Sequence, residues 1–461
     1  MNQKRKKAFL LLVAAAAVAV GAVCANRAHY RSTHIFVEDA VYEKDLTSLN
    51  LRGTGVSLEH IQAVQTQLPE CEVIWELPFQ GSFVAHDAQA LTVTTLSDGD
   101  VALLDHLAQL KSVDASGCTD YPQILALAER RPECEVVYQV SLNGEHYGHD
   151  TEKLSFADAD GEELMQMLRY LPRLKTVVID APTMPPEALL ALVEAYPQIS
   201  FSWNVEVLGT VYPSDTTAID LSRTPLEGIE ELEAGLAYLP ALELLELHHC
   251  GLDDDLLAEY RERQADHYKV VWTVKLDSVN YIRSDATTFM PVMTFSGNLW
   301  DGNIANLKYC NEMVCIDVGH YPITHCDWAA DMPNLQFLVV ADTSIRSIEG
   351  LRGLENLIYL ETFTTPLRDY SPLLEVPNLQ DLNAVNSGMD IETAVRLKSL
   401  KRLWWTGYPS GRISEEEKQR LREAIPGCEF CFKVDTSTGM GWRKGKLYYE
   451  MRDLLGMPYF A

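Results

Sequence analysis

Leu335-x-x-Leu338-x-Val340 opens a pattern that returns along the chain every 21 or 22 residues. Positions 1, 4 and 6 of the pattern are mostly apolar. Its other copies start at Met313, Leu357, Leu379 and Leu400. On a β-strand, positions 4 and 6 point the same way, into a core, whereas positions 3, 5 and 7 point to the opposite face. The period therefore predicts five stacked units, each with one short strand, that share one continuous core.

The N-terminal half uses a longer unit that is built on the same strand pattern. Its copies start at Leu46, Leu110, Leu174 and Leu242, at spacings of 64, 64 and 68 residues, so each unit holds more than one repeat. Within a unit, a helix-like stretch such as 186–193 follows the strand, and an aromatic β-hairpin is expected next. The hairpin copies are 71–75, 134–138, 199–203 and 268–272, with a fifth at 428–432.

Glycine and aspartate recur at fixed places in the longer units. Gly81, Gly144 and Gly209 occupy matching turn positions, where a positive φ favours glycine. An aspartate then precedes the next strand in every long unit. These aspartates are Asp87, Asp150, Asp215 and Asp285. Their recurrence indicates turn or capping residues, because an Asp side chain can hydrogen-bond the nearby backbone.

Over about residues 34–432 the pattern resembles the leucine-rich repeat family, whose units read L-x-x-L-x-L-x-x-N/C-x-L at periods of about 20–29 residues. The resemblance implies an α/β fold: a leucine-rich repeat solenoid with parallel strands on the concave face, a helical or irregular convex side, and inserted β-hairpins in the N-terminal half. Position nine departs from the family pattern, which commonly uses Asn or Cys there. It reads Thr343, Thr365 and Ser387 in three of the short repeats.

Four segments are predicted along the chain. Residues 1–25 are a signal peptide or N-terminal membrane anchor, and 26–280 hold the long units with their aromatic hairpins. Residues 281–432 hold the short repeats, and 433–461 form a C-terminal cap. The last segment breaks the repeat period, and a cap is expected there because the last repeat of an array otherwise exposes an apolar end.

The N-terminus carries the features of an export signal. Basic residues 4–7 precede an uncharged run over 8–25, and the positive-inside rule keeps the basic cluster in the cytoplasm. An uncleaved anchor, a signal cleaved after Ala25 and a lipoprotein signal acting through Cys24 all stay open. We expect the chain on the extracytoplasmic side of the cell membrane, or secreted if it is cleaved after Ala25. The absence of Asn-x-Ser/Thr sequons favours a bacterial envelope.

Composition excludes one class of partner, and motifs give no sign of catalysis. The chain has 38 basic and 66 acidic residues and a net charge of −28. A chain this acidic repels phosphate backbones, so no nucleic-acid partner is expected. The sequence contains no GxSxG, P-loop, GxGxxG or HExxH motif. We therefore predict a protein that is not an enzyme, with no catalytic residues and no cofactor.

Two clusters carry side chains of the metal-ligating kind. The first is Glu145, His146, His149 and Asp150, in which His149 and Asp150 align with His86 and Asp87 of the preceding unit, as structural residues would. The second is Cys310, Cys315, His320, His325 and Cys326, whose spacing matches no zinc finger. A disulfide from Cys310 or Cys315 to Cys326 stays as open as a metal, and buried free thiols are favoured over both. No metal site is predicted.

The outward positions 3, 5 and 7 of the last four repeats carry the candidate ligand-binding residues. Phe337, Tyr359, Phe363 and Trp404 are predicted to form an exposed aromatic band on the concave side, bordered by Glu361, Asp381, Asn383 and Arg402. Mixed patches of this kind mark recognition sites. The alternative is that the cap or a hairpin folds over the band, because aromatic stripes are more often core than contact surface.

Two functions of different class follow from these patterns. The first is a non-enzymatic extracytoplasmic binding module that uses the concave repeat face to recognise a protein, peptide or glycan at the cell surface, and that meets the membrane through its N-terminal segment. The second is a structural scaffold or spacer of the bacterial cell envelope without a discrete ligand site. An exposed aromatic band would favour the first, and covered aromatic residues would favour the second.

Overall fold

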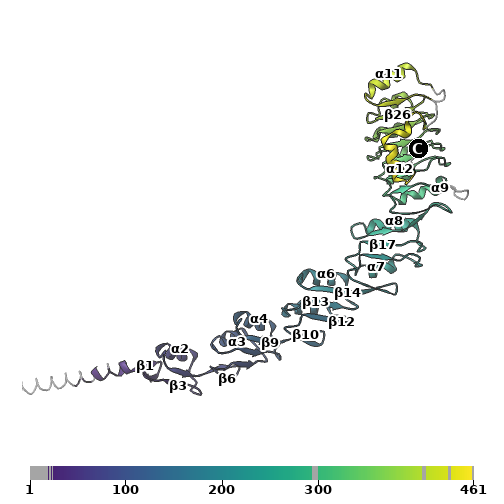
Figure 1. Cartoon of the computed structure of the whole chain (residues 1–461). Coiled ribbons are helices and arrows are strands. Elements are labelled where there is room, and N and C mark those ends of the chain that lie inside the picture. Colours follow the sequence, from purple (N-terminus) through teal and green to yellow (C-terminus); the bar gives the residue numbers. More distant parts are fainter. Residues whose placement is uncertain are drawn as a thin grey trace, which may run out of the picture. The chain divides into compact units, whose positions relative to one another are not determined.

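The computed structural model describes residues 29–292, 299–406, 412–433 and 438–458, and a few positions between 19 and 27. It divides into two compact units, Met1–Trp203 (unit 1) and Asn204–Ala461 (unit 2). Each unit is a mixed α/β structure that contains parallel strands (Figure 1). At this level the predicted fold class is confirmed.

Unit 1 alternates small parallel sheets with antiparallel hairpins. The parallel sheets are β3 (Ser48–Asn50) with β4 (Glu72–Ile74); β7 (Ala90–Thr92) with β8 (Ser112–Asp114) and β9 (Glu135–Val137); and β12 (Lys153–Phe156) with β13 (Thr176–Ile179) and the first half of β14 (Ser200–Val207). The hairpins are β1 (His34–Val37) with β2 (Ala40–Glu43), β5 (Glu76–Phe79) with β6 (Ser82–Ala85), and β10 (Gln139–Leu142) with β11 (Glu145–Gly148). The connecting helices are α2 (Leu58–Gln67), α3 (Asp98–Leu104), α4 (Tyr121–Arg130), α5 (Gly161–Met167) with η1 (Leu168–Tyr170), and α6 (Pro186–Ala195).

The middle sheet of unit 1 shows why its helices form where they do. Helix α3 begins with a capping box, in which Ser97 Oγ accepts from the Asp100 backbone N–H and the Asp100 carboxylate accepts from the Ser97 backbone N–H at 2.9 Å. Helix α4 buries Ile124 and Leu127, three residues apart on one helix face, and packs against β9. Polar caps and an apolar stripe thus place both helices beside the strands.

Unit 2 begins with the same architecture. The second half of β14 forms a hairpin with β15 (Thr210–Pro213), and a second hairpin joins β19 (Thr273–Lys275) to β20 (Tyr281–Arg283). Between them lies a parallel sheet of β16 (Ala218–Asp220), β17 (Leu244–Glu246) and β18 (Lys269–Val271), connected by α7 (Glu230–Leu236) and α8 (Asp254–Arg263).

A seven-stranded parallel sheet then holds the short repeats. Its strands follow chain order: β21 (Thr288–Phe289), β22 (Cys315–Asp317), β23 (Phe337–Val339), β24 (Tyr359–Glu361), β25 (Asp381–Ala384), β26 (Arg402–Trp405) and β27 (Glu429–Cys431). The connections are short helices: α9 (Asp301–Ile304), η2 (Ala305–Tyr309), η3 (Asp327–Asp331), η4 (Glu349–Leu351), η5 (Ser371–Glu375), α10 (Ile391–Ala394) and α11 (Glu415–Ala424). After β27 come η6 (Trp442–Lys444) and α12 (Lys446–Leu454).

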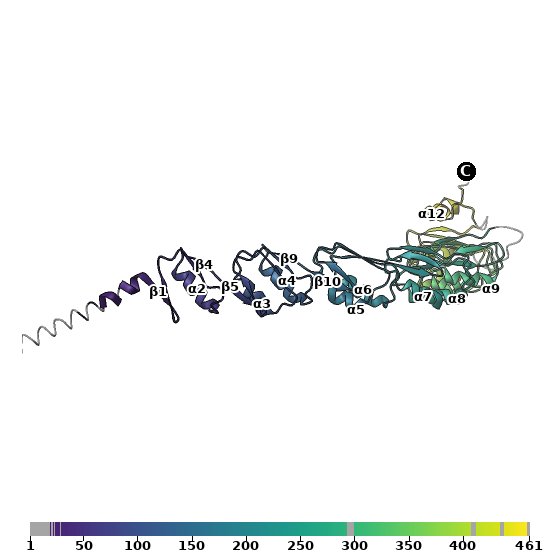
Figure 2. The ribbon, with the colours of Figure 1, turned by 90° about the horizontal axis from the view of Figure 1, so that it is seen from below.

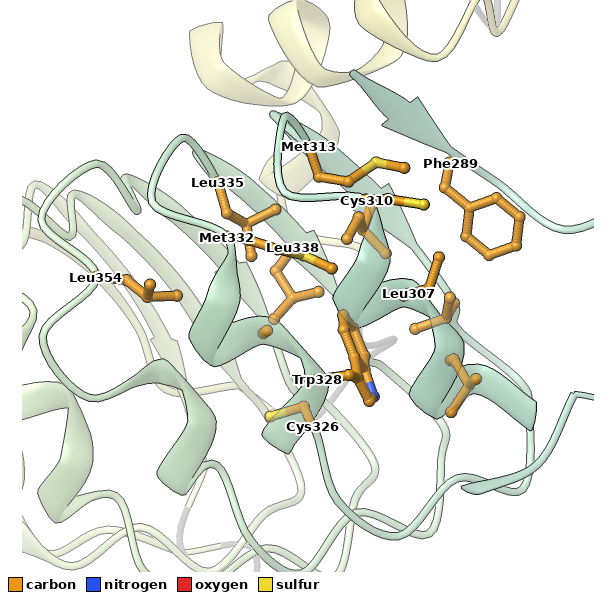
Figure 3. Packing of buried hydrophobic residues seen from close by; sticks show 14 of the residues in the cluster. Phe289, Leu307, Cys310, Met313, Cys326, Trp328, Met332, Leu335, Leu338 and Leu354 are labelled. Carbon is orange, nitrogen blue, oxygen red and sulfur yellow. The ribbon is translucent and has the colours of Figure 1, made fainter. Parts of the chain in front are cut away.

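The repeat leucines stack in register across this sheet. Parallel pairing places Leu338 beside Leu360, Leu360 beside Leu382 and Leu382 beside Leu403. All four are completely buried and belong to one continuous core with the connecting helices. Figure 3 shows Leu338 in this core together with Trp328 of η3. The strand phase predicted from the period is therefore the observed one.

Short hydroxyl side chains at position nine bond to the backbone. Thr343 and Thr365 each donate, at 2.7 Å, to the carbonyl oxygen of the residue three positions earlier, and Ser387 does the same at 2.8 Å. Each bond satisfies a buried carbonyl at the end of a strand. Hydroxyl groups thus satisfy the equivalent carbonyl in three consecutive repeats.

The structure corrects the prediction for the aromatic hairpins. Residues 72–74, 135–137 and 269–271, predicted to begin hairpins, are the last parallel strands β4, β9 and β18 of their sheets, and the hairpin follows each of them. The fifth copy contains β27, which is parallel to β26. A run of alternating apolar residues does not reveal which strand it pairs with. Sequence alone therefore could not distinguish the last strand of a parallel sheet from the first strand of a hairpin. The turn glycines Gly81, Gly144 and Gly209 do have positive φ values, of 76°, 76° and 78°.

Replacing a stacked leucine should destabilise unit 2. Leu360→Ala is expected to lower the free energy of unfolding by about 2–5 kcal/mol, because it leaves a cavity in a completely buried position. Glu355→Ala, at an exposed position at the end of the preceding repeat, should change it by no more than about 0.5 kcal/mol. Urea denaturation monitored by circular dichroism measures both values. Equal, small effects would contradict the strand phase.

Candidate functional site

The predicted ligand-binding residues come together on one face of the seven-stranded sheet. One row across the strands is Phe337, Tyr359, Asp381 and Arg402, and the next row includes Glu361, Asn383 and Trp404. Phe363 belongs to the same buried cluster as the other aromatic residues. We call this the outward face, meaning the side chains at positions 3, 5 and 7 of the repeats that contain β22 to β26, opposite the stacked leucines.

The predicted exposure of the aromatic band is wrong. Tyr359 is 0% exposed, Phe337 and Trp404 are 2% exposed, and Phe363 is 7% exposed. The covering element is residues 438–458, which we call the C-terminal segment. Its members in the buried cluster of the outward face are Trp442, Tyr448 and Met451. Figure 2 shows α12 on one side of the strands of unit 2 and α7, α8 and α9 on the other. The structure thus has the covered arrangement, and a ligand-binding role for these residues stays a prediction.

The C-terminal segment packs on the outward face, whereas the sequence predicted a cap over the open end of the last repeat. The apolar side chains of α12 explain this placement. Leu447, Tyr448, Met451 and Leu455 recur at helical spacing and pack in the cluster of the outward face. At the end of the sheet, Phe430 and Phe432 stay half-buried, with their rings stacked at 5.6 Å. The apolar side of α12 therefore packs on the aromatic row and not on this edge.

Trp442 is the central contact between the segment and the face. Its indole Nε1–H donates to Glu361 Oε1 at 2.8 Å and lies 3.0 Å from the Tyr359 hydroxyl, which itself donates to Glu361. The ring is tilted against Tyr359 and Trp404, with centroid distances of 5.6 and 5.3 Å. One indole therefore fills an aromatic pocket and satisfies a buried carboxylate at its base.

Arg402 makes the second anchor. Its Nη1 donates to Asp381 Oδ2 at 2.9 Å, and its Nη2 donates to the backbone carbonyls of Trp442 and Gly441 at 3.0 and 3.2 Å. The guanidinium lies 4.6 Å from the ring centroids of both Trp404 and Trp442. Arg402 thus binds the segment through main-chain atoms and through a ring.

Helix α12 continues across the face as far as β22. Cys315 Sγ lies 4.0 Å from the Met451 carbonyl oxygen. Arg452 is buried and donates to the Tyr448 hydroxyl at 3.2 Å. Desolvation raises the pKa of the half-buried Asp317 carboxyl, against the Gly319 backbone N–H and the charges of His320 and Arg452, which lower it.

Burial also raises the pKa values of the other carboxyl groups on this face. Desolvation raises the pKa of Glu361 to about 7, against the hydrogen bonds from Trp442 and Tyr359 and the charge of Arg443, which lower it; Asp317 raises it further. Desolvation raises the pKa of Asp381 despite its pairing with Arg402. The face therefore holds carboxyl groups whose protonation depends on whether the segment covers them.

The two metal-type clusters do not form sites in the described ranges. Within residues 29–292, 299–406, 412–433 and 438–458, no group of three or more His, Cys, Asp or Glu side chains could hold a metal ion. His149 stacks on Tyr138 with a centroid distance of 5.1 Å, and His320 Nδ1 lies 2.8 Å from an Asp342 carboxylate oxygen at the surface. Cys310, Cys315 and Cys326 are buried free thiols whose pKa values burial raises. Such thiols behave as small apolar residues.

The predicted signal peptide or N-terminal membrane anchor, residues 1–25, lies almost entirely outside the described residues. In the part of the chain that is described, no helix has the length and apolar character that a membrane crossing requires.

Sequence reasoning missed Trp442 and its partners in the C-terminal segment as part of the site. The local charge of the segment could have pointed to them. In a chain with a net charge of −28, this segment has four basic residues, Arg443, Lys444, Lys446 and Arg452, against two acidic ones, Glu450 and Asp453. A locally basic stretch in an acidic chain predicts a contact with acidic groups elsewhere.

No family model matches the chain, and no curated protein matches it. Solved structures with some likeness include internalin C2 of Listeria monocytogenes, with 21% sequence identity, a TM-score of 0.23, and coverage of 42% of this chain and 74% of that one. The internalin InlF of the same species has 13% identity, a TM-score of 0.27, and coverage of 86% and 91%. A leucine-rich repeat protein of Leptospira interrogans has 14% identity, a TM-score of 0.28, and coverage of 74% and 93%. Because these TM-scores are below 0.5, fold and function are inferred from this chain's own contacts.

Raising the pH should weaken the contact between the C-terminal segment and the outward face. The pKa of Glu361 is raised in the covered state from an ordinary value of 4.5 to about 7. Its stabilising contribution is therefore fully present below about pH 4.5 and is lost as the pH rises through about 7. We expect the free energy of docking to fall by about 2–3 kcal/mol between pH 5 and 8.5. Urea titrations followed by the 19F signal of 5-fluorotryptophan at position 442 measure it.

Glu361→Gln is the matched control for this pH dependence. The amide keeps an oxygen that can accept from Trp442 and Tyr359 but does not titrate. This variant should show a much flatter dependence between pH 5 and 8.5. An equally steep dependence in the variant would assign the titration to Asp317 or Asp381 instead.

Proposed function

We propose that this chain is a non-enzymatic binding module, a leucine-rich repeat solenoid that recognises a protein or peptide outside the cytoplasm with the outward face of β22 to β26. One observation supports the proposal above all. The face holds a helical segment through specific polar anchors, with Trp442 bonded to Glu361 and Arg402 bonded to segment carbonyls. A surface with these contacts can bind a peptide of matching shape and charge.

The division between the two buried clusters of unit 2 supports a recognition role. The stacked leucines and connecting helices form one cluster, and the outward face with the C-terminal segment forms another. The outward face buries Glu361, Asp381 and most of Arg402, and removal of such groups from water costs free energy. A face that served stability alone would gain more from apolar side chains, so its charged anchors favour selection of a particular ligand.

A peptide ligand accounts for the chemistry of the face better than a glycan does. Aromatic rings could stack on sugars as well as on side chains. Arg402, however, donates to the backbone carbonyls of the successive residues Gly441 and Trp442, and the rings of the face pack around an indole. These are features of peptide recognition.

The domain division and the location belong to the same proposal. Residues 281–432 would supply the binding face, 26–280 would form the long units with their hairpins, and 1–25 would export or anchor the chain. The acidic composition and the basic residues 4–7 before the apolar run support this arrangement.

A structural scaffold of the cell envelope is the second candidate. The coverage of the aromatic band by the C-terminal segment favours it, because a permanently covered face offers no ligand site. In that case the segment would act only to strengthen unit 2.

The proposed location has a direct test. In cells whose wall has been removed, an added protease should digest the chain, because everything after residue 25 is expected outside the membrane. Immunoblotting against an epitope in 412–433 follows the loss of the full-length chain. Protection until the cells are lysed would place the chain in the cytoplasm and end this part of the proposal.

The proposed binding face can be tested by photo-cross-linking in the native host. Replacing Phe363 by p-benzoylphenylalanine keeps an aromatic group at the border of the outward face, and the same residue at Glu355 serves as the exposed control. We expect a defined protein cross-linked from position 363 and not from 355. Equal cross-linking from both positions, or none from 363, would favour the scaffold.

A further inference from the structure

We propose that the C-terminal segment is an exchangeable internal ligand of the outward face, and that the partner this face binds is a basic amphipathic helix preceded by an indole. The inference rests on the proposed function and names the ligand class for the same site. It adds a regulatory consequence, since a partner must displace residues 438–458 before it can bind.

Charge indicates what kind of helix the face accepts. The outward face carries three carboxyl groups, those of Asp317, Glu361 and Asp381. Arg402 forms an ion pair with Asp381. The segment that covers them is locally basic although the chain as a whole is strongly acidic. Of the segment's basic residues, Arg452 is buried near Asp317, whereas Arg443, Lys444 and Lys446 are exposed. An acidic helix would meet repulsion at the same place.

Side-chain spacing indicates the shape of the ligand. The indole of Trp442 enters the pocket between Tyr359 and Trp404, and a short turn then leads into α12. From α12, Tyr448 and Met451 pack on the face, with Leu447 and Leu455 half-buried beside them. A helix with apolar residues at this spacing on one side, and an indole before its first turn, reproduces every contact of this group.

The segment can leave without uncovering the leucine core. Its buried residues belong to the outward cluster alone, and the stacked leucines face the opposite side of the sheet. Its contacts also include several charged and polar anchors, as is typical of interfaces that open and close. Displacement would therefore expose one face of a sheet whose other face stays packed.

Gly445 provides a way to loosen the segment without altering the face. A Cβ atom at this position would lie 1.6 Å from Arg402 Nη1. Arg402 cannot simply move aside, because it is held by Asp381 and by the carbonyls of Gly441 and Trp442. The glycine has an ordinary negative φ of −68°, so Gly445→Ala acts through this contact and not through backbone strain.

The test uses the full-length chain and a fluorescein-labelled peptide of residues 438–458. In Gly445→Ala the internal segment is weakened while the face keeps all its side chains. We expect the peptide to bind this variant at least tenfold more tightly than the wild-type chain, as measured by fluorescence anisotropy. Lys446→Ala is the matched control, because Lys446 begins the same helix with an exposed side chain. It should bind the peptide as weakly as the wild type. A peptide carrying Trp442→Ala should bind Gly445→Ala at least tenfold more weakly than the native peptide.

The outcomes separate this inference from the proposed function. Equal, weak binding to wild type and Gly445→Ala would show that the segment is a fixed part of the fold. If Gly445→Ala does not fold, as judged by circular dichroism, Trp442→Ala in the chain replaces it with the same expected tenfold gain. Sedimentation would detect a dimer of either variant in which two chains exchange their C-terminal segments. Such a dimer would identify the occupant as a second copy of the chain and overturn the partner proposed here. If a protein is cross-linked from position 363 but the peptide does not bind Gly445→Ala more tightly than the wild type, only this inference is overturned. If there is neither cross-linking from position 363 nor peptide binding, the proposed function is overturned as well.

Discussion

The stacking of one leucine per strand across β23 to β26 is the interaction on which the rest of unit 2 depends. Leu338, Leu360, Leu382 and Leu403 are paired in register, and a shift of any strand by one residue would turn its leucine out of the core. The same register fixes the opposite face. Because neighbouring strands lie about 4.8 Å apart, side chains at positions 3 and 5 also form straight rows. The outward face is thus organised by the core without contributing to it.

This organisation explains how the outward face can hold buried charged groups. Glu361 receives hydrogen bonds from Trp442 and Tyr359, and Arg402 is shared between Asp381 and carbonyls of the C-terminal segment. Without the segment these groups would be hydrated, and with it they are satisfied by protein. The face and the segment are therefore energetically coupled. The leucine core lies on the other side of the sheet and does not share their contacts.

The parts of this structure that could be predicted from the sequence are those that depend on local periodicity. Alternation around Leu338 and its equivalents gives the strands and their phase, and Gly81 marks a hairpin turn because glycine relieves a positive φ. The pairing of β4 and β9 was misassigned, because an apolar alternation does not state whether its partner is parallel or antiparallel. For Tyr359 the sequence left two arrangements open, an exposed band and a band covered by the cap or a hairpin. Its cover, Trp442, lies 83 residues further along the chain, and no periodic pattern links the two.

The extent of the aromatic rows matches the extent of the covering segment. The contacts of the segment run from Cys315 on β22 to Trp404 on β26. In the long units the equivalent outward positions carry no aromatic residue and are mostly polar and partly or fully exposed, as at Ser48, Ser112 and Asp114, with Val178 and Leu244 as half-buried apolar exceptions. General stabilisation of a repeat array would not require this correspondence, since every repeat has an outward face. A face that changes from polar to aromatic only where a complementary helix lies on it is instead shaped for that helix, or for a ligand that resembles it.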